Sequence, residues 1–258
     1  MEKLSIVVPT FNEAGNVEKL AERVNKALYD VNYEIIFIDD STDNTPEVLE
    51  ALSMKDTRIR YEHRVGETGL ATAVIRGFQV ADGEILACMD ADLQHPPEIL
   101  RSMYAAVMSG FDFCIPSRFI PGGSDGGLDP YRKFVSWVAR WIGKVLLPCL
   151  RKISDPTSGL FMFRKEVIDG ADLRPVGWKI MIEVLAMSNY STVVEIPYGF
   201  QDRTSGESKL SGKVTMQYLQ QVKNLMSRAT KRGGITVTRW TSSRTDAAVH
   251  EILQKSSK

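Results

Sequence analysis

The chain has 258 residues, with 32 Lys and Arg against 32 Asp and Glu, so its formal net charge at pH 7 is zero. Its 43% hydrophobic and 25% charged residues are typical of a globular protein and exclude intrinsic disorder, collagen-like structure and coiled coil. The neutral total also argues against a nucleic-acid partner. It hides an asymmetry, because the net charge is −10 over residues 1–100, +3 over residues 101–200 and +7 over residues 201–258. The function should account for an acidic first part and a basic last part.

The cysteines and the hydropathy pattern limit the compartment and the topology. Cys88, Cys114 and Cys149 are widely spaced among apolar residues, which favours small buried side chains in a reducing compartment over disulfides or a zinc site. No run of 18 consecutive apolar residues occurs, so we expect no helix that crosses a membrane.

The first 116 residues alternate short apolar runs with longer amphipathic ones. The apolar runs predict strands at residues 4–8, 34–38, 58–62, 84–89 and 111–115. Helical spacing of apolar residues predicts helices at residues 13–29, 45–54, 68–80 and 96–108. Strands that alternate with helices in this way favour an open, mostly parallel α/β sheet flanked by helices.

The second part is less regular. Residues 117–130 are rich in glycine and turn formers and predict a long loop. Residues 131–150 predict a helix whose apolar stripe is surrounded by Lys and Arg, and so does the basic stretch 214–228. Each could lie in a membrane interface, or could be an ordinary core-facing helix with solvated charges. From residue 233 on the pattern is weak, and we expect residues 231–258 to be partly disordered.

Polar and acidic residues follow several of the predicted strands. The first strand runs into residues 9–13, the second into residues 39–43 and the fourth into residues 90–94. Open α/β sheets bind ligands at the carboxyl ends of their strands, so these segments are candidates for a binding site. The alternative for any one of them is turn and helix-cap chemistry, which uses the same residue types.

The segment Asp90-Ala91-Asp92 is the most informative of these. It follows an apolar strand and places two carboxylates where the sheet opens, and a cation between them would relieve their repulsion. Oxygen ligands without His or Cys favour a hard ion such as Mg²⁺ or Mn²⁺, whose shell is commonly completed by substrate phosphates. A helix cap before Pro96 is the alternative. The motifs of dinucleotide-binding folds, P-loop ATPases and serine hydrolases do not occur.

The order of motifs resembles the family-2 inverting glycosyltransferases of GT-A fold. The motifs are PTFNE, IDDSTDNT, RVGETGLATAVIRGF, MDADLQHPP and IPSRF, in this order from residue 9 to residue 119. Further segments are similar to those of the polyprenyl-phosphate (dolichyl-phosphate) β-mannosyltransferases, namely GLATAVIRGF, SDPTSGLFMFRKEV, GWKIMIEVL and RTSGESKLS. The resemblance covers residues 4–230 and implies one GT-A catalytic domain over residues 1–230, with 231–258 unassigned.

The resemblance implies a role for each matched position. Nucleotide-sugar contacts are expected from Pro9, Phe11, Glu13, Ile38, Asp40, Asp90, Ala91, Asp92, Arg118, Lys179, Arg203 and Lys209. The metal ligands would be Asp90, Asp92 and Gln94, with Mg²⁺ or Mn²⁺ as cofactor. Arg132 and Ser208 would meet the acceptor phosphate. The groups expected to act on the reacting atoms are Asp92, Arg118 and Arg203. For each basic residue the alternative is a solvated surface charge.

The resemblance also implies a reaction and a location. Mannose would pass from GDP-mannose to dolichyl or polyprenyl phosphate, with inversion, at the cytoplasmic face of a prokaryotic plasma membrane or of the endoplasmic reticulum. Segments 131–152 and 213–230 would lie at the membrane interface, or a membrane-anchoring partner would hold the protein there. One alternative is a UDP-glucose-using transferase, although such relatives usually differ where this chain has GETGLATAVIRGF. Another is a catalytically silent nucleotide-sugar-binding protein.

Overall fold

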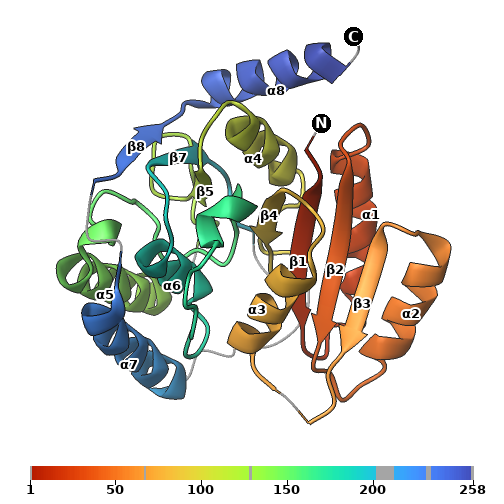
Figure 1. Cartoon of the computed structure of the whole chain (residues 1–258), viewed down its shortest axis with the longest axis horizontal. Helices are drawn as coiled ribbons and strands as arrows, with labels where there is room; N and C mark the ends of the chain where they lie inside the picture. Colours follow the sequence, from red (N-terminus) through yellow and green to blue (C-terminus); the bar gives the residue numbers. More distant parts are fainter. Residues whose placement is uncertain (1, 67, 128–129, 202–211, 231–233, 257–258) are drawn as a thin grey trace.

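A computed structural model describes residues 2–256 apart from residues 67, 128–129, 202–211 and 231–233. Its centre is an eight-stranded sheet in the order β3-β2-β1-β4-β6-β5-β7-β8 (Figure 1). The strands are β1 (Leu4–Thr10), β2 (Tyr33–Asp39), β3 (Ile59–His63), β4 (Ile85–Cys88), β5 (Phe113–Ser117), β6 (Phe161–Arg164), β7 (Thr192–Pro197) and β8 (Thr236–Arg239). Neighbouring strands are parallel except at β6, which is antiparallel to β4 and β5.

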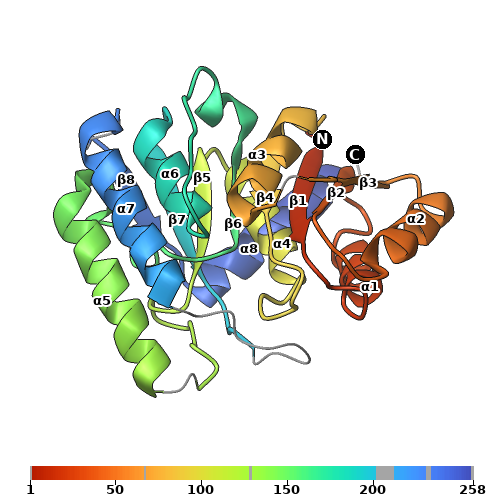
Figure 2. The same cartoon turned by 90° about the horizontal axis from the view of Figure 1, so that it is seen from below.

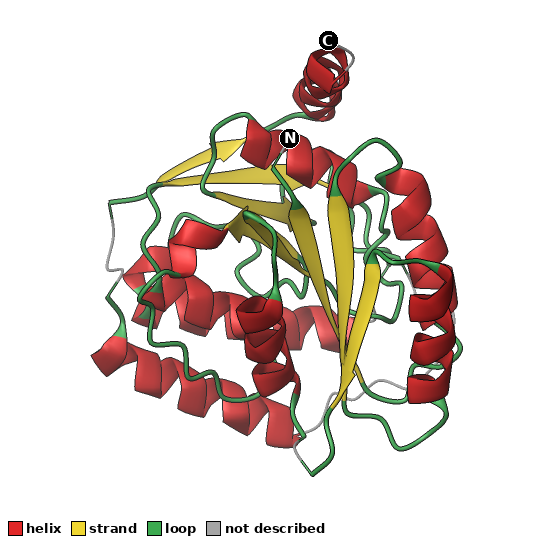
Figure 3. Ribbon diagram, turned by 45° about the vertical axis from the view of Figure 1, so that its right-hand side comes forward, coloured by secondary structure: helices red, strands yellow, loops and turns green. Residues whose placement is uncertain are grey.

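Helices cover both faces of the sheet (Figure 3). They are α1 (Val17–Ala27), α2 (Thr45–Lys55), α3 (Leu70–Val80), α4 (Ile99–Met108), α5 (Pro130–Leu146), α6 (Ile180–Met187), α7 (Gly212–Arg228) and α8 (Ser242–Ser256), with short 3₁₀ turns at Pro148–Leu150 and Lys165–Ile168. One hydrophobic core contains residues of α3, α6 and α7, and the other contains residues of α1, α2, α4 and α8. Successive residues of β1 point alternately into these two cores, as a strand covered on both faces requires.

The predicted α/β fold is confirmed, and the prediction for the first 116 residues holds element by element. All seven residues of β1 and of β2 are buried, which explains why both read as continuous apolar runs. The cysteines Cys88, Cys114 and Cys149 are buried and free of disulfides. Burial raises the pKa of the Cys88 thiol well above its usual value, and it also raises the pKa of the Cys114 thiol.

The end of the chain differs from its expected partial disorder. Strand β8 pairs with β7 in parallel, and α8 packs along α4. Trp240 lies between these elements, is 7% exposed and forms a T-shaped contact with the Phe111 ring, with 5.7 Å between the ring centroids. The sequence signal was weak because β8 has four residues and only one face of α8 is buried. The domain boundary at residue 230 stays a prediction, although the sheet continues beyond it through β8.

Helices α5 and α7 lie side by side on one flank of the molecule (Figure 2). Large apolar side chains on both are exposed, including Trp137 (55%), Trp141 (57%) and Met216 (66%). Within the described part of the chain, none of the helices has the length and hydropathy that a bilayer crossing requires.

Candidate functional site

The register of the central strands brings the predicted residues to one edge of the sheet. Pro9 on β1 lies opposite Ile38 on β2, and the Met89 N–H bonds to the Val7 carbonyl at 3.0 Å. Asp90, the next residue, therefore leaves the sheet beside the end of β1. The carboxyl ends of parallel strands meet at the same edge, which is why segments far apart in sequence converge here.

The loops after β1 and β2 are fastened to each other. Asn12 adopts a left-handed conformation (φ 59°), and its side-chain oxygen accepts hydrogen bonds from the N–H groups of Thr42 (2.9 Å) and Asp43 (3.3 Å). The Glu13 N–H donates to Thr45 Oγ1 at 3.0 Å. The ring of Phe11 is 44% exposed on this fastened loop, where a flat aromatic ligand could stack against it.

Asp40 is engaged by Arg64, a residue that the sequence reading did not single out. Arg64 donates from Nε and Nη2 to the two oxygens of Asp40, at 2.7 and 2.6 Å, and both side chains are about 5% exposed. The Gly69 N–H donates to the same carboxylate at 2.9 Å. Asp40 thus fixes the start of α3 next to the site. The only signal in the sequence was the position of Arg64 in the RVGETG motif.

The acidic turn after β4 holds the predicted metal ligands Asp90, Asp92 and Gln94. Asp92 Oδ1 accepts the Gln94 N–H at 3.1 Å, and Leu93 between them is left-handed (φ 60°). The Gln94 side chain is buried, with Nε2 3.5 Å from the Gln201 carbonyl. In the described part of the chain, no cluster of three or more His, Cys, Asp or Glu could hold a metal unaided. The oxygen donors of this turn nonetheless fit a hard cation that shares its shell with phosphates.

Arg118 lies at the end of β5, across the antiparallel strand β6 from the acidic turn. Its Nε and Nη2 donate to the two oxygens of Asp155 at 2.8 and 3.1 Å, and the side chains are 10% and 0% exposed. The guanidinium also lies 5.1 Å from the ring centroids of Phe119 and Phe200. Burial alone would lower the pKa of Arg118, but Asp155 outweighs it and raises the pKa.

Lys179, at the N-terminus of α6, reaches the same region. Its Nζ donates to the Thr157 carbonyl at 2.9 Å. Burial lowers the pKa of Lys179, and the nearby charge of Arg118 lowers it further, whereas Asp90 and Asp155 act in the opposite direction. The structure therefore brings Asp90, Arg118 and Lys179 within electrostatic range of one another.

The neighbouring histidine does not provide an obvious base. His95 is buried beside Tyr198, with its Nδ1 3.1 Å from the tyrosine oxygen. Burial, followed by the charges of Arg118 and Lys179, lowers the pKa of His95 to about 3. Its imidazole is therefore neutral near pH 7 and packs as part of the site's wall.

The other predicted cations are placed less completely. Arg132 lies in the first turn of α5, and nothing is described of its side chain. Arg203, Ser208 and Lys209 lie outside the described residues. Arg140 is one of the cations of α5, and its guanidinium lies 3.6 Å from the centroid of the Phe119 ring. A second arginine thus lies next to Arg118.

Comparisons with known proteins show the family to which the chain belongs. The family model "Glycosyl transferase family 2" matches residues 5–170. The chain belongs to this family of glycosyltransferases. A dolichol-phosphate mannosyltransferase of Pyrococcus furiosus is 45% identical over 87% of the chain, and the chain covers 64% of that protein. One of Saccharomyces cerevisiae is 37% identical over 86% of each chain, and a polyprenol monophosphomannose synthase of Mycolicibacterium smegmatis is 35% identical over 82% of each.

Solved structures support the fold. Glucosyl-3-phosphoglycerate synthase from Mycobacterium tuberculosis, in complex with Mn²⁺, UDP and phosphoglyceric acid, superposes with a TM-score of 0.66 at 18% identity, covering 88% of this chain and 78% of that one. At this identity the likeness concerns the GT-A fold alone. The chain therefore has the predicted GT-A fold and the predicted family.

Proposed function

We propose that this chain transfers mannose from GDP-mannose to the phosphate of a dolichyl or polyprenyl phosphate, with inversion at the anomeric carbon. The proposal rests first on one observation: Asp90, in the acidic turn after β4, lies within electrostatic range of Lys179, which also feels the charge of Arg118, at one edge of the sheet. The names of the relatives from Pyrococcus furiosus, Saccharomyces cerevisiae and Mycolicibacterium smegmatis support the sugar and the class of acceptor.

The acidic side would bind the donor. A Mg²⁺ or Mn²⁺ ion held by Asp90, Asp92 and Gln94 would neutralise charge on the departing diphosphate. A structural neighbour with the same fold contains Mn²⁺ together with UDP, which supports the use of a divalent ion with a nucleotide. The nucleotide would contact Pro9, Phe11, Glu13, Ile38, Asp40 and Ala91. Arg118, Lys179, Arg203 and Lys209 would surround the phosphates.

The acceptor needs alignment more than activation. A phosphate monoester is already anionic near neutral pH, so its oxygen can attack without a strong general base. The neutral, buried His95 is consistent with such a mechanism. Arg132 and Ser208 would hold the acceptor phosphate, and Asp92 would assist the transfer.

A lipid-extraction assay tests the proposal directly. The protein is incubated with Mn²⁺ or Mg²⁺, labelled GDP-mannose and a short polyprenyl phosphate, and the lipid fraction is counted. Label should enter the lipid only when both a donor and a divalent ion are present, and NMR of the product should show the β anomer. Label from UDP-glucose and not from GDP-mannose would refute the proposed donor. No transfer from either sugar would favour the catalytically silent alternative.

The same reaction requires access to a lipid, and we propose that α5 and α7 provide it at the cytoplasmic face of a membrane. Their exposed apolar side chains lie beside cations such as Lys133 and Lys144, a combination suited to an anionic bilayer surface. Trp141→Asp is expected to weaken sedimentation with vesicles that contain anionic lipid. Met54→Asp, at a 77% exposed position on α2, is the matched control and should bind as the unaltered protein does. If the unaltered protein does not bind vesicles, a membrane-anchoring partner becomes the better explanation.

A further inference from the structure

The segment that precedes β6 connects the two sides of the candidate site. Strand β6 runs antiparallel to its neighbours β4 and β5, so its first residue, Phe161, lies at the edge where those strands end. The residues before it, 154–160, must therefore cross the site between the acidic turn and Arg118. They include Asp155, which is completely buried.

Asp155 holds Arg118 in a single orientation. Two parallel hydrogen bonds fix the plane of the guanidinium, and the rings of Phe119 and Phe200 lie next to it. An arginine on a short connection after a strand would otherwise have several rotamers open to it. The remaining guanidinium donors keep the direction that this pair dictates.

The same segment contacts the other charged groups of the site. The Thr157 carbonyl accepts the hydrogen bond from Lys179 at 2.9 Å. Gly159 lies against Asp90 so closely that a Cβ at this position would be 2.2 Å from Asp90 Oδ2. Residues 155–159 therefore contact Arg118, Lys179 and Asp90 without supplying any group to which we assign a chemical role.

The segment is itself anchored by the C-terminal half of the sheet. Glu195 on β7 is completely buried and accepts hydrogen bonds from the Ser154 N–H (2.6 Å) and Oγ (2.7 Å). Arg239 on β8 donates to Glu195 Oε2 at 3.1 Å and to the Lys152 carbonyl at 2.9 Å. Both anchors lie beyond residues 5–170, the part that the family model matches. The position of Asp155 is thus set by elements outside that match.

We propose that Asp155 is a positioning residue that aims Arg118 at the phosphates of the donor. The proposal rests on the proposed function, because Arg118 is placed beside the donor phosphates there. An arginine that is already oriented loses less side-chain freedom when it binds, so its interaction with phosphate is stronger. Asp155 would act on the donor through Arg118 and not by direct contact.

A double-mutant cycle on nucleotide binding tests this without relying on turnover. The dissociation constant of GDP with Mn²⁺ is measured by calorimetry for Asp155→Asn, Arg118→Ala and the double variant. Asp155→Asn is expected to weaken GDP binding by about 10-fold or more, the size of one charge-assisted hydrogen bond. In the Arg118→Ala background the same substitution should have little effect. An equal loss in both backgrounds would overturn the proposal, because Asp155 would then act independently of Arg118.

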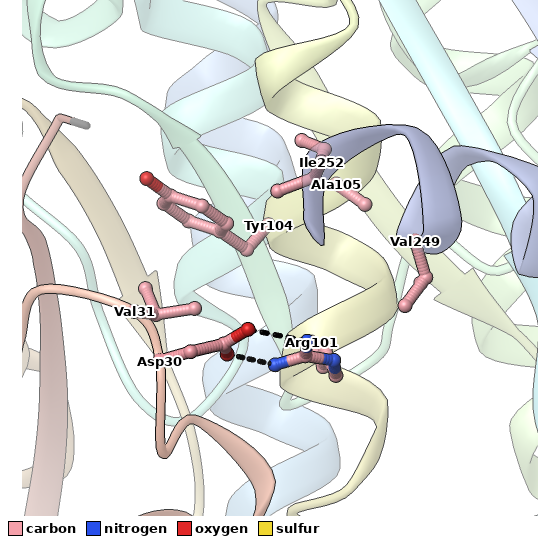
Figure 4. A pocket seen from close by; sticks show the side chains of 7 residues that line it. All are labelled: Asp30, Val31, Arg101, Tyr104, Ala105, Val249 and Ile252. Carbon is pink, nitrogen blue, oxygen red and sulfur yellow. Dashed lines mark hydrogen bonds and ion pairs between the residues drawn. The ribbon is translucent and has the colours of Figure 1, made fainter. Parts of the chain in front are cut away.

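Two further variants distinguish a specific loss of GDP binding from a general loss of stability. Asp155→Glu keeps the charge beside Arg118 but moves the carboxylate by one methylene, and it should also weaken GDP binding; wild-type affinity would contradict a positioning role. Asp30→Asn serves as the control, because Asp30 forms another ion pair with two hydrogen bonds, to Arg101. Asp30 and Arg101 line a small pocket together with Val249 and Ile252 of α8 (Figure 4). This control should lower the melting temperature and leave GDP binding unchanged. GDP binding is measured independently of turnover. If the double-mutant cycle gives the expected result but no mannose is transferred, the proposed function is refuted and the positioning role of Asp155 stands.

Discussion

The carboxyl edge of the sheet is acidic where β1, β2 and β4 end and basic where β5 ends and α6 begins. On the acidic side, Asp40 directly follows β2, and Asp90 and Asp92 come two and four residues after the end of β4. On the basic side, Arg118 follows a strand, but Lys179 comes from the start of a helix and Arg140 from the middle of another. These three cations belong to residues 101–200, whose net charge is +3. Arg203 and Lys209, which belong to the +7 stretch, lie outside the described residues.

The two sides also differ in how their charges are stabilised. Asp40 has Arg64 and a backbone N–H from the start of α3, within the same half of the sheet. Arg118 depends on Asp155, whose segment is anchored by β7 and β8. The acidic side is therefore built from local strand–helix connections, whereas the basic side requires long-range contacts. Substitutions made on each side separately measure what that side contributes to turnover and to stability.

The largest effect is expected from the acidic side. Asp92→Asn removes one charge from the proposed metal site, and turnover should fall by about 1,000-fold at saturating Mn²⁺, because the leaving diphosphate loses its counter-charge. Circular dichroism should show an unchanged fold. Asp82→Asn, at a 64% exposed side chain on the opposite edge of the sheet, serves as the control and should keep normal turnover. Full activity of Asp92→Asn would remove the metal assignment.

A smaller effect is expected where the two sides touch. Gly159→Ala adds a Cβ that cannot coexist with the present position of Asp90 Oδ2, so the carboxylate or the segment must move. Turnover should fall by about 10- to 100-fold, with a higher Mn²⁺ concentration needed for half-maximal rate. Gly15→Ala is the matched control, because a Cβ there meets no atom within 4 Å. Equal activity of the two variants would mean that the two sides are not coupled through this contact.

The smallest effect on turnover is expected from a carboxylate at the far edge of the sheet. Burial opposes ionisation of Glu34, but hydrogen bonds from Ser5, Arg60 and the Asp82 N–H outweigh it and lower its pKa from 4.5 to about 2. A lowered pKa stabilises the fold above pH 4.5, and this contribution disappears as the pH falls towards 2. Glu34→Gln should therefore reduce the free energy of unfolding by about 3 kcal/mol at pH 7, and by less at pH 3.5, in urea titrations. A difference that does not shrink with pH would contradict this, as would a loss of kcat.

The sequence predicted the acidic half of the protein well. Strands such as β1 and β2 are buried on both faces, so their apolar runs are continuous and their ends are marked by polar residues. Once the sheet is known to be parallel, those ends must share one edge, and Asp40 and Asp90 follow. The family resemblance was confirmed by the match over residues 5–170.

The sequence predicted much less about the basic half and the C-terminus. Strand β8 has four residues, and each of them pairs with a β7 residue 44 positions earlier in the sequence. Nothing about Arg64 or Asp155 in isolation distinguishes a buried ion-pair partner from a solvated charge. Each acquires its role from a residue 24 or 37 positions distant.

The sequence by itself thus determined the fold class, the family and the acidic edge, because periodic burial and strand ends are local properties that neighbouring residues encode. Only the tertiary structure decided which cation faces which carboxylate and that residues 155–159 connect the two sides of the site. It also decided that Thr236–Arg239 extend the sheet as β8 and that α8 packs against α4. These features depend on contacts between residues that are distant in the sequence. Such contacts form only when the chain folds, so no local sequence pattern predicts them.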